Sequence, residues 1–87
     1  AETVGRLMRQ LGQDRQVLAV THLPQVAACA HHHLQVAKAS EQGQTFSTVA
    51  SLDSGTRVHE VARMLGGERI SDTSLAHARE MLEGAGA

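Results

Sequence analysis

The stretch QVLAVTHLPQVA, residues 16–27, places a histidine directly after an apolar run. Val17 to Val20 form the run, His22 follows it, and Pro24 marks a sharp turn. An imidazole can donate a hydrogen bond to a phosphate oxygen or to an attacking water. In open α/β sheets, ligands bind outside the carboxyl ends of the strands. His22 is therefore a candidate catalytic and ligand-binding residue; the alternative is a histidine that merely caps the next helix.

A second group of chemically capable residues follows, Cys29 and the run His31, His32 and His33. Thiolate and imidazole are zinc ligands, but a zinc site needs about four of them, and no second pair stands at a finger-like spacing. On a strand, His31 and His33 would face one side and His32 the other. We therefore expect a polar helix-to-strand junction with a small buried thiol, and no native metal site.

Other reactive groups lack the sequence context that catalysis needs. Ser47, Ser51 and Ser54 stand in no Gly-x-Ser-x-Gly turn, so a serine nucleophile is not expected. His59 and His77 are most simply solvated or half-buried helical residues. The sequence holds no Gly-x-x-x-x-Gly-Lys-Ser/Thr loop and no apolar strand ending in Asp-Glu. We therefore expect the chain alone to hold neither ATP nor magnesium, and to be inactive by itself.

Three stretches repeat apolar residues with helical spacing. The first ends at Gly12, and its opposite face carries Arg6 and Arg9, which face solvent or a partner. The second covers residues 56–67, and the third starts near residue 71. The apolar positions are Val4, Leu7, Met8 and Leu11 in the first, Val58, Val61, Ala62 and Leu65 in the second, and Leu75, Ala78 and Leu82 in the third.

The start and the end of the third helix carry their own signals. Ser71 fits the N-cap position, and Ile70 and Leu75 can then form a hydrophobic staple across it. Residues 83–87, EGAGA, are expected to fray.

Strand patterns occupy the middle of the chain. Residues 17–20 are continuously apolar, which suits a strand covered on both faces. A short helix over 23–30 would have its proline at the first position. Residues 31–40 and 44–52 then predict a hairpin with a loop over 40–44. The order is α-β-α-β-β-α-α, an α/β segment whose lone parallel-type strand has no partner, so other strands must come from outside this sequence.

Composition agrees with an incomplete unit. The chain has 87 residues, no Trp or Tyr and one Phe, so Ala, Val and Leu must form its core. A net charge of −1 gives no reason to expect nucleic-acid or membrane binding by this segment itself. One cysteine suggests a reducing, cytoplasmic setting. The chain has neither a leader-like N-terminus nor a run of roughly 20 apolar residues, and it opens as if cut from something longer.

Three motifs together resemble one family. QVLAVTHLPQVAACAHHHLQVAK, RVHEVARMLGG and TSLAHAREML are similar to the C-terminal end of the RecN family of bacterial DNA repair proteins, which are SMC-like members of the ABC ATPase class. The resemblance runs from about Glu2 to Leu82. Many ABC-type heads share VTHLPQVA in looser form, whereas ARMLGG combined with LAHAREML narrows the match to RecN.

The resemblance implies that residues 1–87 are the C-terminal part of a P-loop ATPase head, whose sequence a long coiled coil divides. His22 matches the switch (H-loop) histidine, which contacts the γ-phosphate region and helps to position the attacking water. The first helix matches the one that follows the Walker B and D-loop motifs. ATP and Mg²⁺ would be bound by the full-length protein. Cys29 and His31 to His33 match no motif of the family.

The implied partners are the remainder of the same head, a second head in an ATP-dependent dimer, and DNA through the full-length protein. The implied location is the cytoplasm, with the nucleoid. Two other hypotheses stay open at the level of sequence: a non-catalytic α/β interaction module, and, less favoured, a Cys/His metal-binding domain. The isolated segment is expected to self-associate, to rearrange locally or to be marginally stable.

Overall fold

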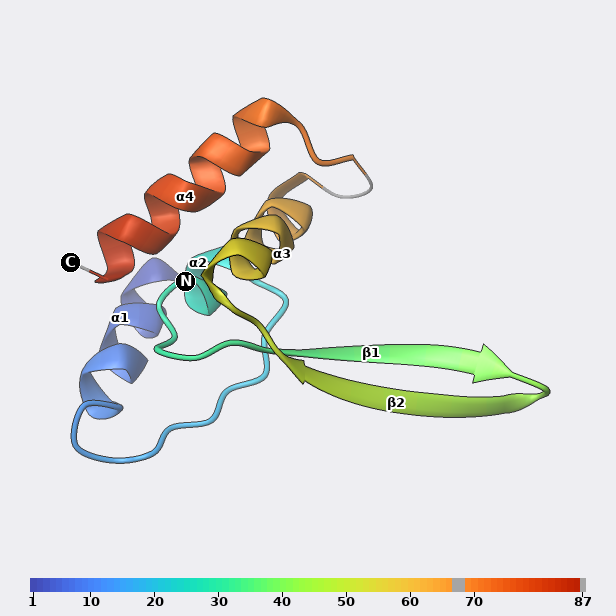
Figure 1. The fold of residues 1–87 in the computed structure, drawn as a ribbon. Helices are drawn as coiled ribbons and strands as arrows, with labels where there is room; N and C mark the ends of the chain where they lie inside the picture. The colour runs from blue at the N-terminus through green and yellow to red at the C-terminus, as the bar shows by residue number, and fades with distance from the viewer. Residues whose placement is uncertain (67–68, 87) are drawn as a thin grey trace.

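A computed structural model describes residues 1–66 and 69–86. Figure 1 shows the helices gathered into one body, from which a long hairpin projects. The radius of gyration is 13.9 Å, whereas a compact chain of this length would have about 12 Å. The elements are α1 (Glu2–Leu11), α2 (Pro24–Ala27), β1 (Leu34–Glu41), β2 (Gln44–Ser51), α3 (Ser54–Gly66) and α4 (Asp72–Gly86).

The main core lies between α3 and α4, which pack side by side (Figure 1). Val61, Ala62 and Ala78 are completely buried there. The predicted apolar faces of these two helices are therefore confirmed. The residues that pack around this centre are Val58, Leu65, Leu75, Met81 and Leu82. Small side chains at the centre let the helices approach closely, but they bury little apolar area.

The predicted first helix is confirmed as α1, but its apolar face does not enter a core. Val4, Leu7 and Leu11 are 49%, 55% and 48% exposed. The buried position of α1 is Gly5, which faces α2. Most of the apolar face of α1 is thus left uncovered by the described part of the chain.

The strand predicted from the apolar run of residues 17–20 is not formed, and that prediction is wrong for this chain. The segment has no regular secondary structure, and Leu18 and Val20 are 83% and 100% exposed. A strand needs a neighbour for its backbone N–H and C=O groups, and the described part of the chain supplies none here. The observed order is therefore α-α-β-β-α-α.

The predicted hairpin is confirmed with shorter limits. β1 and β2 pair antiparallel, with Leu34 opposite Ser51 and Glu41 opposite Gln44. The turn has only two residues, Gln42 and Gly43, with φ of 51° and 77°, as expected for the mirror-image turns that match strand twist. His31 to His33 precede β1 instead of lying in it. A two-stranded hairpin is at best marginally stable in water, and Gln35 is the one residue of the two strands that is half-buried, the others being exposed.

Side-chain caps fix the starts of α3 and α4. The Thr56 backbone N–H donates to Asp53 Oδ1 at 2.8 Å, so Asp53 caps α3 and starts it two residues before the predicted limit. The predicted cap at Ser71 is confirmed, since Ser71 Oγ accepts from the Ser74 N–H at 3.1 Å. The tail was expected to fray from residue 83, whereas α4 continues to Gly86; Gly67 and Ala87 lie outside the described residues.

Ile70, the outer half of the expected staple, is 42% exposed. Within the described ranges, no helix combines the length and the apolar character that a bilayer crossing needs.

Candidate functional site

His22 lies in a tight turn between residues 16–21, which have no regular secondary structure, and α2, and its side chain is exposed. The Thr21 hydroxyl accepts the Leu23 N–H at 3.0 Å. Leu23 has extended backbone angles, φ −93° and ψ 118°, as expected of a residue before proline. Its carbonyl accepts the N–H groups of Val26 and Ala27 at 3.1 and 3.0 Å. Hydrogen bonds on both sides of His22 therefore fix how the backbone presents it.

Pro24 occupies the first position of α2, as the sequence predicts. The helix is much shorter than expected, with four residues, Pro24–Ala27. Helices of this length are not stable alone, since nucleation fixes several residues for the first hydrogen bond. Contacts with other elements must therefore hold α2 in place.

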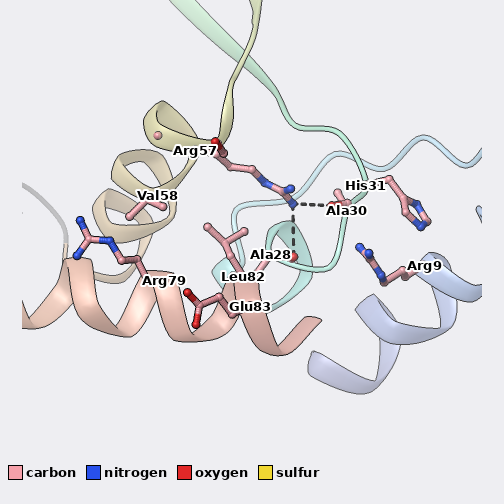
Figure 2. A pocket seen from close by; sticks show the side chains of 11 residues that line it. Arg9, Ala28, Ala30, His31, Arg57, Val58, Arg79, Leu82 and Glu83 are labelled. Atoms are coloured by element: carbon pink, nitrogen blue, oxygen red, sulfur yellow. Dashed lines mark hydrogen bonds between the residues drawn. The ribbon is translucent and has the colours of Figure 1, made fainter. Parts of the chain in front are cut away.

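Two arginines from other helices bond to the carboxyl end of α2, and Figure 2 shows the bonds from Arg57 to Ala28 and Ala30. Arg57 Nη2, from α3, donates to the carbonyls of Ala27, Ala28 and Ala30 at 3.0, 3.4 and 2.6 Å. Arg9 Nη1, from α1, donates to the Cys29 carbonyl at 2.7 Å. The last carbonyls of a helix have no partners within it and carry partial negative charge. Two guanidinium groups thus satisfy four consecutive carbonyls at this end.

Burial and the nearby charge of Arg9 both lower the pKa of Arg57, in that order. Arg57 Nε is buried and has no hydrogen-bond partner in the described structure. Bringing two like charges to one turn is unfavourable in itself. The carbonyls of residues 27–30 offset this cost.

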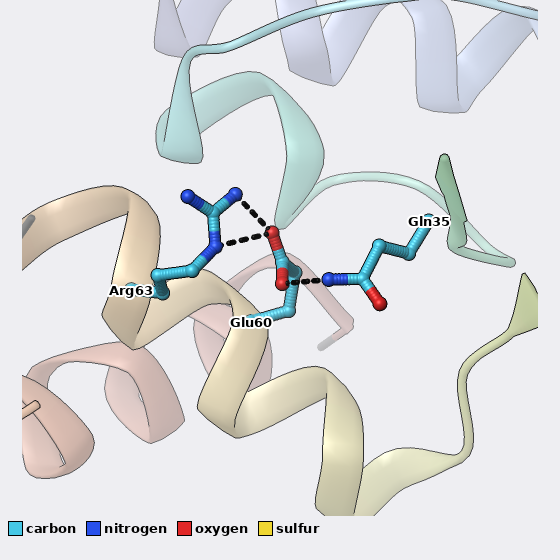
Figure 3. Close-up of polar contacts among 3 residues, drawn as sticks. All are labelled: Gln35, Glu60 and Arg63. Atoms are coloured by element: carbon cyan, nitrogen blue, oxygen red, sulfur yellow. Dashed lines mark hydrogen bonds and ion pairs between the residues drawn. The ribbon is translucent and has the colours of Figure 1, made fainter. Parts of the chain in front are cut away.

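A second polar contact joins the base of the hairpin to α3 (Figure 3). Glu60 is only 8% exposed, and its carboxylate accepts from Gln35 Nε2 at 2.5 Å and from Arg63 Nε at 3.0 Å. The hydrogen bond and charge of Glu60 raise the pKa of Arg63. A buried carboxylate needs such partners, because an unpaired one would be strongly destabilising.

His33 is near enough to Arg57 and to Glu60 for the charges of both to act on its imidazole. Burial and the charge of Arg57 lower its pKa, while Glu60 acts in the opposite direction. Its Nδ1 atom is buried without a hydrogen-bond partner among the residues described. His33 is therefore a structural histidine that the neutral form suits best.

The other predicted candidates do not converge on a metal or a nucleotide. The Cys29 thiol is buried and donates to the Gln25 carbonyl at 3.4 Å. The ring of His31 lies next to Gly12. In residues 1–66 and 69–86, no group of three or more His, Cys, Asp or Glu side chains could hold a metal ion. His59 and His77 are exposed on their helices.

An open hollow of about 490 Å³ lies beside the Arg57 contact, and His22 does not line it. Figure 2 shows Arg9, Arg57 and Leu82 around it. The His22 imidazole therefore lies outside this hollow. The described part of the chain does not enclose a binding cavity around His22 by itself.

Sequence reasoning singled out His22 as a candidate, and it did not identify Arg57, Arg9 and Glu60 as contributors to this region. Each of these three acts through a partner distant in sequence, so no local motif reports it. The one local feature that could have pointed to Arg57 and Glu60 is their place on α3, a helix that also packs into the core.

Comparisons with known proteins bear on the whole chain, although no protein-family model matches it. The chain is 51% identical over 82 residues to DNA repair protein RecN of Vibrio cholerae, a match covering 94% of this chain and 15% of that protein. It is 49% identical over 84 residues to RecN of Deinococcus radiodurans, a match covering 97% of this chain and 15% of that protein. It is 46% identical over 83 residues to RecN of Haemophilus influenzae, a match covering 95% of this chain and 15% of that protein.

The chain thus spans about 15% of the length of these curated relatives. The relatives come from distantly related bacteria, and each match covers nearly all of the chain in which VTHLPQVA, ARMLGG and LAHAREML occur. The resemblance inferred from these motifs is confirmed: by sequence, the chain is related to DNA repair protein RecN and corresponds to a small part of it.

Proposed function

We propose that the chain is the C-terminal segment of the ATP-binding and ATP-hydrolysing head of a RecN-like protein that repairs double-strand breaks by recombination. In this proposal His22 is the switch histidine, which donates to the transferring phosphate or to the attacking water. Positioned donors of this kind account for much of the catalysis of phosphoryl transfer.

The observation that carries the proposal is the uncovered segment of residues 16–21. Its apolar side chains are exposed, with Val20 fully so, and its backbone runs directly into the fixed turn at His22. Apolar residues of a strand are normally covered by neighbours. A head that supplies these neighbours would bury the segment and leave His22 at the carboxyl end of a strand, where α/β sheets bind ligands.

The residues present fit ATP and Mg²⁺ only in part. The exposed imidazole of His22 can meet a phosphate oxygen, but the sequence has no glycine-rich phosphate loop. The phosphate cradle and the carboxylates for magnesium must therefore come from the remainder of the longer protein. The partners that follow are that remainder, a second head, and DNA bound by the whole protein in the cytoplasm.

The test is His22→Ala in the longer RecN-like protein that contains this segment. We expect turnover of ATP to fall by about 100-fold or more, the usual loss for a positioned donor, with ATP affinity nearly unchanged. His32→Ala removes an exposed imidazole from the same region of the chain and is the matched control. Turnover would be measured by phosphate release, and affinity by equilibrium binding of a fluorescent ATP analogue.

An unchanged maximal rate with weaker ATP binding would contradict the role given to His22. If His22→Ala affected neither quantity, a non-catalytic interaction module would be the better description of the chain.

A further inference from the structure

The contact between Arg57 and the carboxyl end of α2 joins three helices at one point. Arg57 reaches from the first turns of α3 to three carbonyls, and Arg9 reaches from α1 to the carbonyl between them. The bond to the Ala30 carbonyl, at 2.6 Å, is short, as expected for a charged donor. All the carbonyls of residues 27–30 are thereby used.

The other end of α2 is only two residues from His22. Its position there depends on the Leu23 carbonyl and on Pro24, both of which move with the helix. A helix of four residues is too short to hold its own direction. The guanidinium of Arg57 therefore provides the main polar contact that fixes the direction of α2 relative to α3, and with it the direction in which the turn presents His22.

We propose that Arg57 is a positioning residue for His22: its contacts with the Ala27, Ala28 and Ala30 carbonyls orient α2 and so aim the exposed imidazole. This inference rests on the proposed function. A lysine at this position would keep the charge, but its side chain is shorter than that of arginine, whose Nη2 atom makes all three contacts, so the ammonium would lie farther from the carbonyls.

The charge of Arg57 is not replaceable by any nearby group in the described structure. Arg9 is already bonded to Cys29, and Arg79 lies on α4, across the hollow (Figure 2). Removing the guanidinium would leave carbonyls 28 and 30 to water, while carbonyl 27 would keep the Ala30 N–H at 3.2 Å. Arg9 would then be the remaining side-chain donor at this end of the helix.

The test uses a double-mutant cycle in the longer RecN-like protein, with Arg57→Gln, His22→Ala and the combination of both. Displacement of a catalytic group by about 1 Å can lower turnover by about 100-fold, so we expect Arg57→Gln to lower kcat by at least about tenfold without changing ATP affinity. In the His22→Ala background, Arg57→Gln should cause no further loss. Arg57→Lys should recover only part of the rate.

Arg79→Gln, which removes an exposed arginine beside the same hollow, is the matched control and should leave kcat unchanged. Hydrogen exchange should be faster at residues 23–30 in Arg57→Gln and unaltered in the α3–α4 core. If Arg57→Gln does not fold, Arg57→Lys replaces it throughout the cycle.

The outcomes separate the two proposals. Normal kcat in Arg57→Gln, or an equal further loss in the His22→Ala background, would overturn the positioning role while leaving the role of His22 intact. Normal kcat in His22→Ala itself would overturn both.

Discussion

Glu60 is the only charged residue that is buried in the described structure. One of its two hydrogen-bond partners precedes it in the sequence and the other follows it. Gln35 reaches it from the hairpin and Arg63 from the next turn of α3. His33 lies close enough to feel the charges of both Glu60 and Arg57. A polar contact, between Gln35 and Glu60, therefore joins the hairpin to the helical body.

The environment of His33 predicts a dependence of stability on pH. Its pKa is lowered from 6.5, mainly by burial and then by Arg57, so the folded chain favours the neutral form. Just below pH 6.5, His33 binds a proton more readily in the unfolded chain than in the folded chain. The free energy of unfolding should thus fall as pH decreases through this value, and His33 should contribute no pH dependence above it.

Urea unfolding between about pH 7.5 and pH 5 would measure this slope. His33→Gln should flatten it, and His32→Gln, at an exposed neighbouring position, is the control for loss of an imidazole. A slope that is the same in His33→Gln and in the parent chain would contradict the prediction.

At the scale of the elements, close approach between α1 and α2 depends on one glycine. A Cβ atom added at Gly5 would lie 2.9 Å from Cys29 Sγ and 3.2 Å from the Gln25 carbonyl oxygen. Real Cβ atoms rarely come so near to other atoms, and the carbonyl belongs to the backbone and cannot rotate away. The contact therefore fixes how near the two helices lie.

Gly5→Ala should destabilise the fold. Alanine gains up to about 1 kcal/mol of helix propensity over glycine, but overpacking typically costs about 1–3 kcal/mol, so the loss should exceed the gain. Gly84→Ala is the matched control, because it is also helical and a Cβ atom added there would meet no other atom within 4 Å. Thermal unfolding should show a lower midpoint for Gly5→Ala and an equal or higher one for Gly84→Ala; a higher midpoint for Gly5→Ala would show that α1 shifts to make room.

At the scale of the whole molecule, the chain covers too little of its own apolar surface. The core between α3 and α4 is closed, whereas the apolar face of α1, the segment before His22 and much of the hairpin are exposed. Extended backbone with free N–H and C=O groups invites pairing with another strand. Exposed apolar patches add a second reason for association.

We therefore expect the isolated chain to self-associate through residues 16–21. Sedimentation over a concentration series would measure it, and Leu18→Lys should reduce it by placing a charge on the open edge. Val49→Lys, at an exposed position of the already paired hairpin, is the matched control. A monomer at every concentration, with slow hydrogen exchange at residues 17–20, would contradict this expectation.

Local sequence determined the helices, the hairpin and the caps. Helical spacing located the buried faces of α3 and α4, Ser71 capped α4, and Gly43 marked the turn of the hairpin. These features depend on residues within a few positions of one another, so a single sequence contains their causes. The same holds for the turn at His22, where Thr21 and Pro24 are close in sequence to the residue they position.

The tertiary structure alone decided the remaining features. Residues 16–21 have the pattern of a buried strand, yet whether they pair depends on a neighbour that the described part of this chain does not supply. The apolar face of α1 is exposed for the same reason. The carbonyls that Arg57 contacts belong to residues that lie between 27 and 30 positions before it in the sequence. Glu60 and its partner Gln35 are separated by 25 positions. Contacts between distant segments depend on how all the elements pack, and no local pattern of residue types records that.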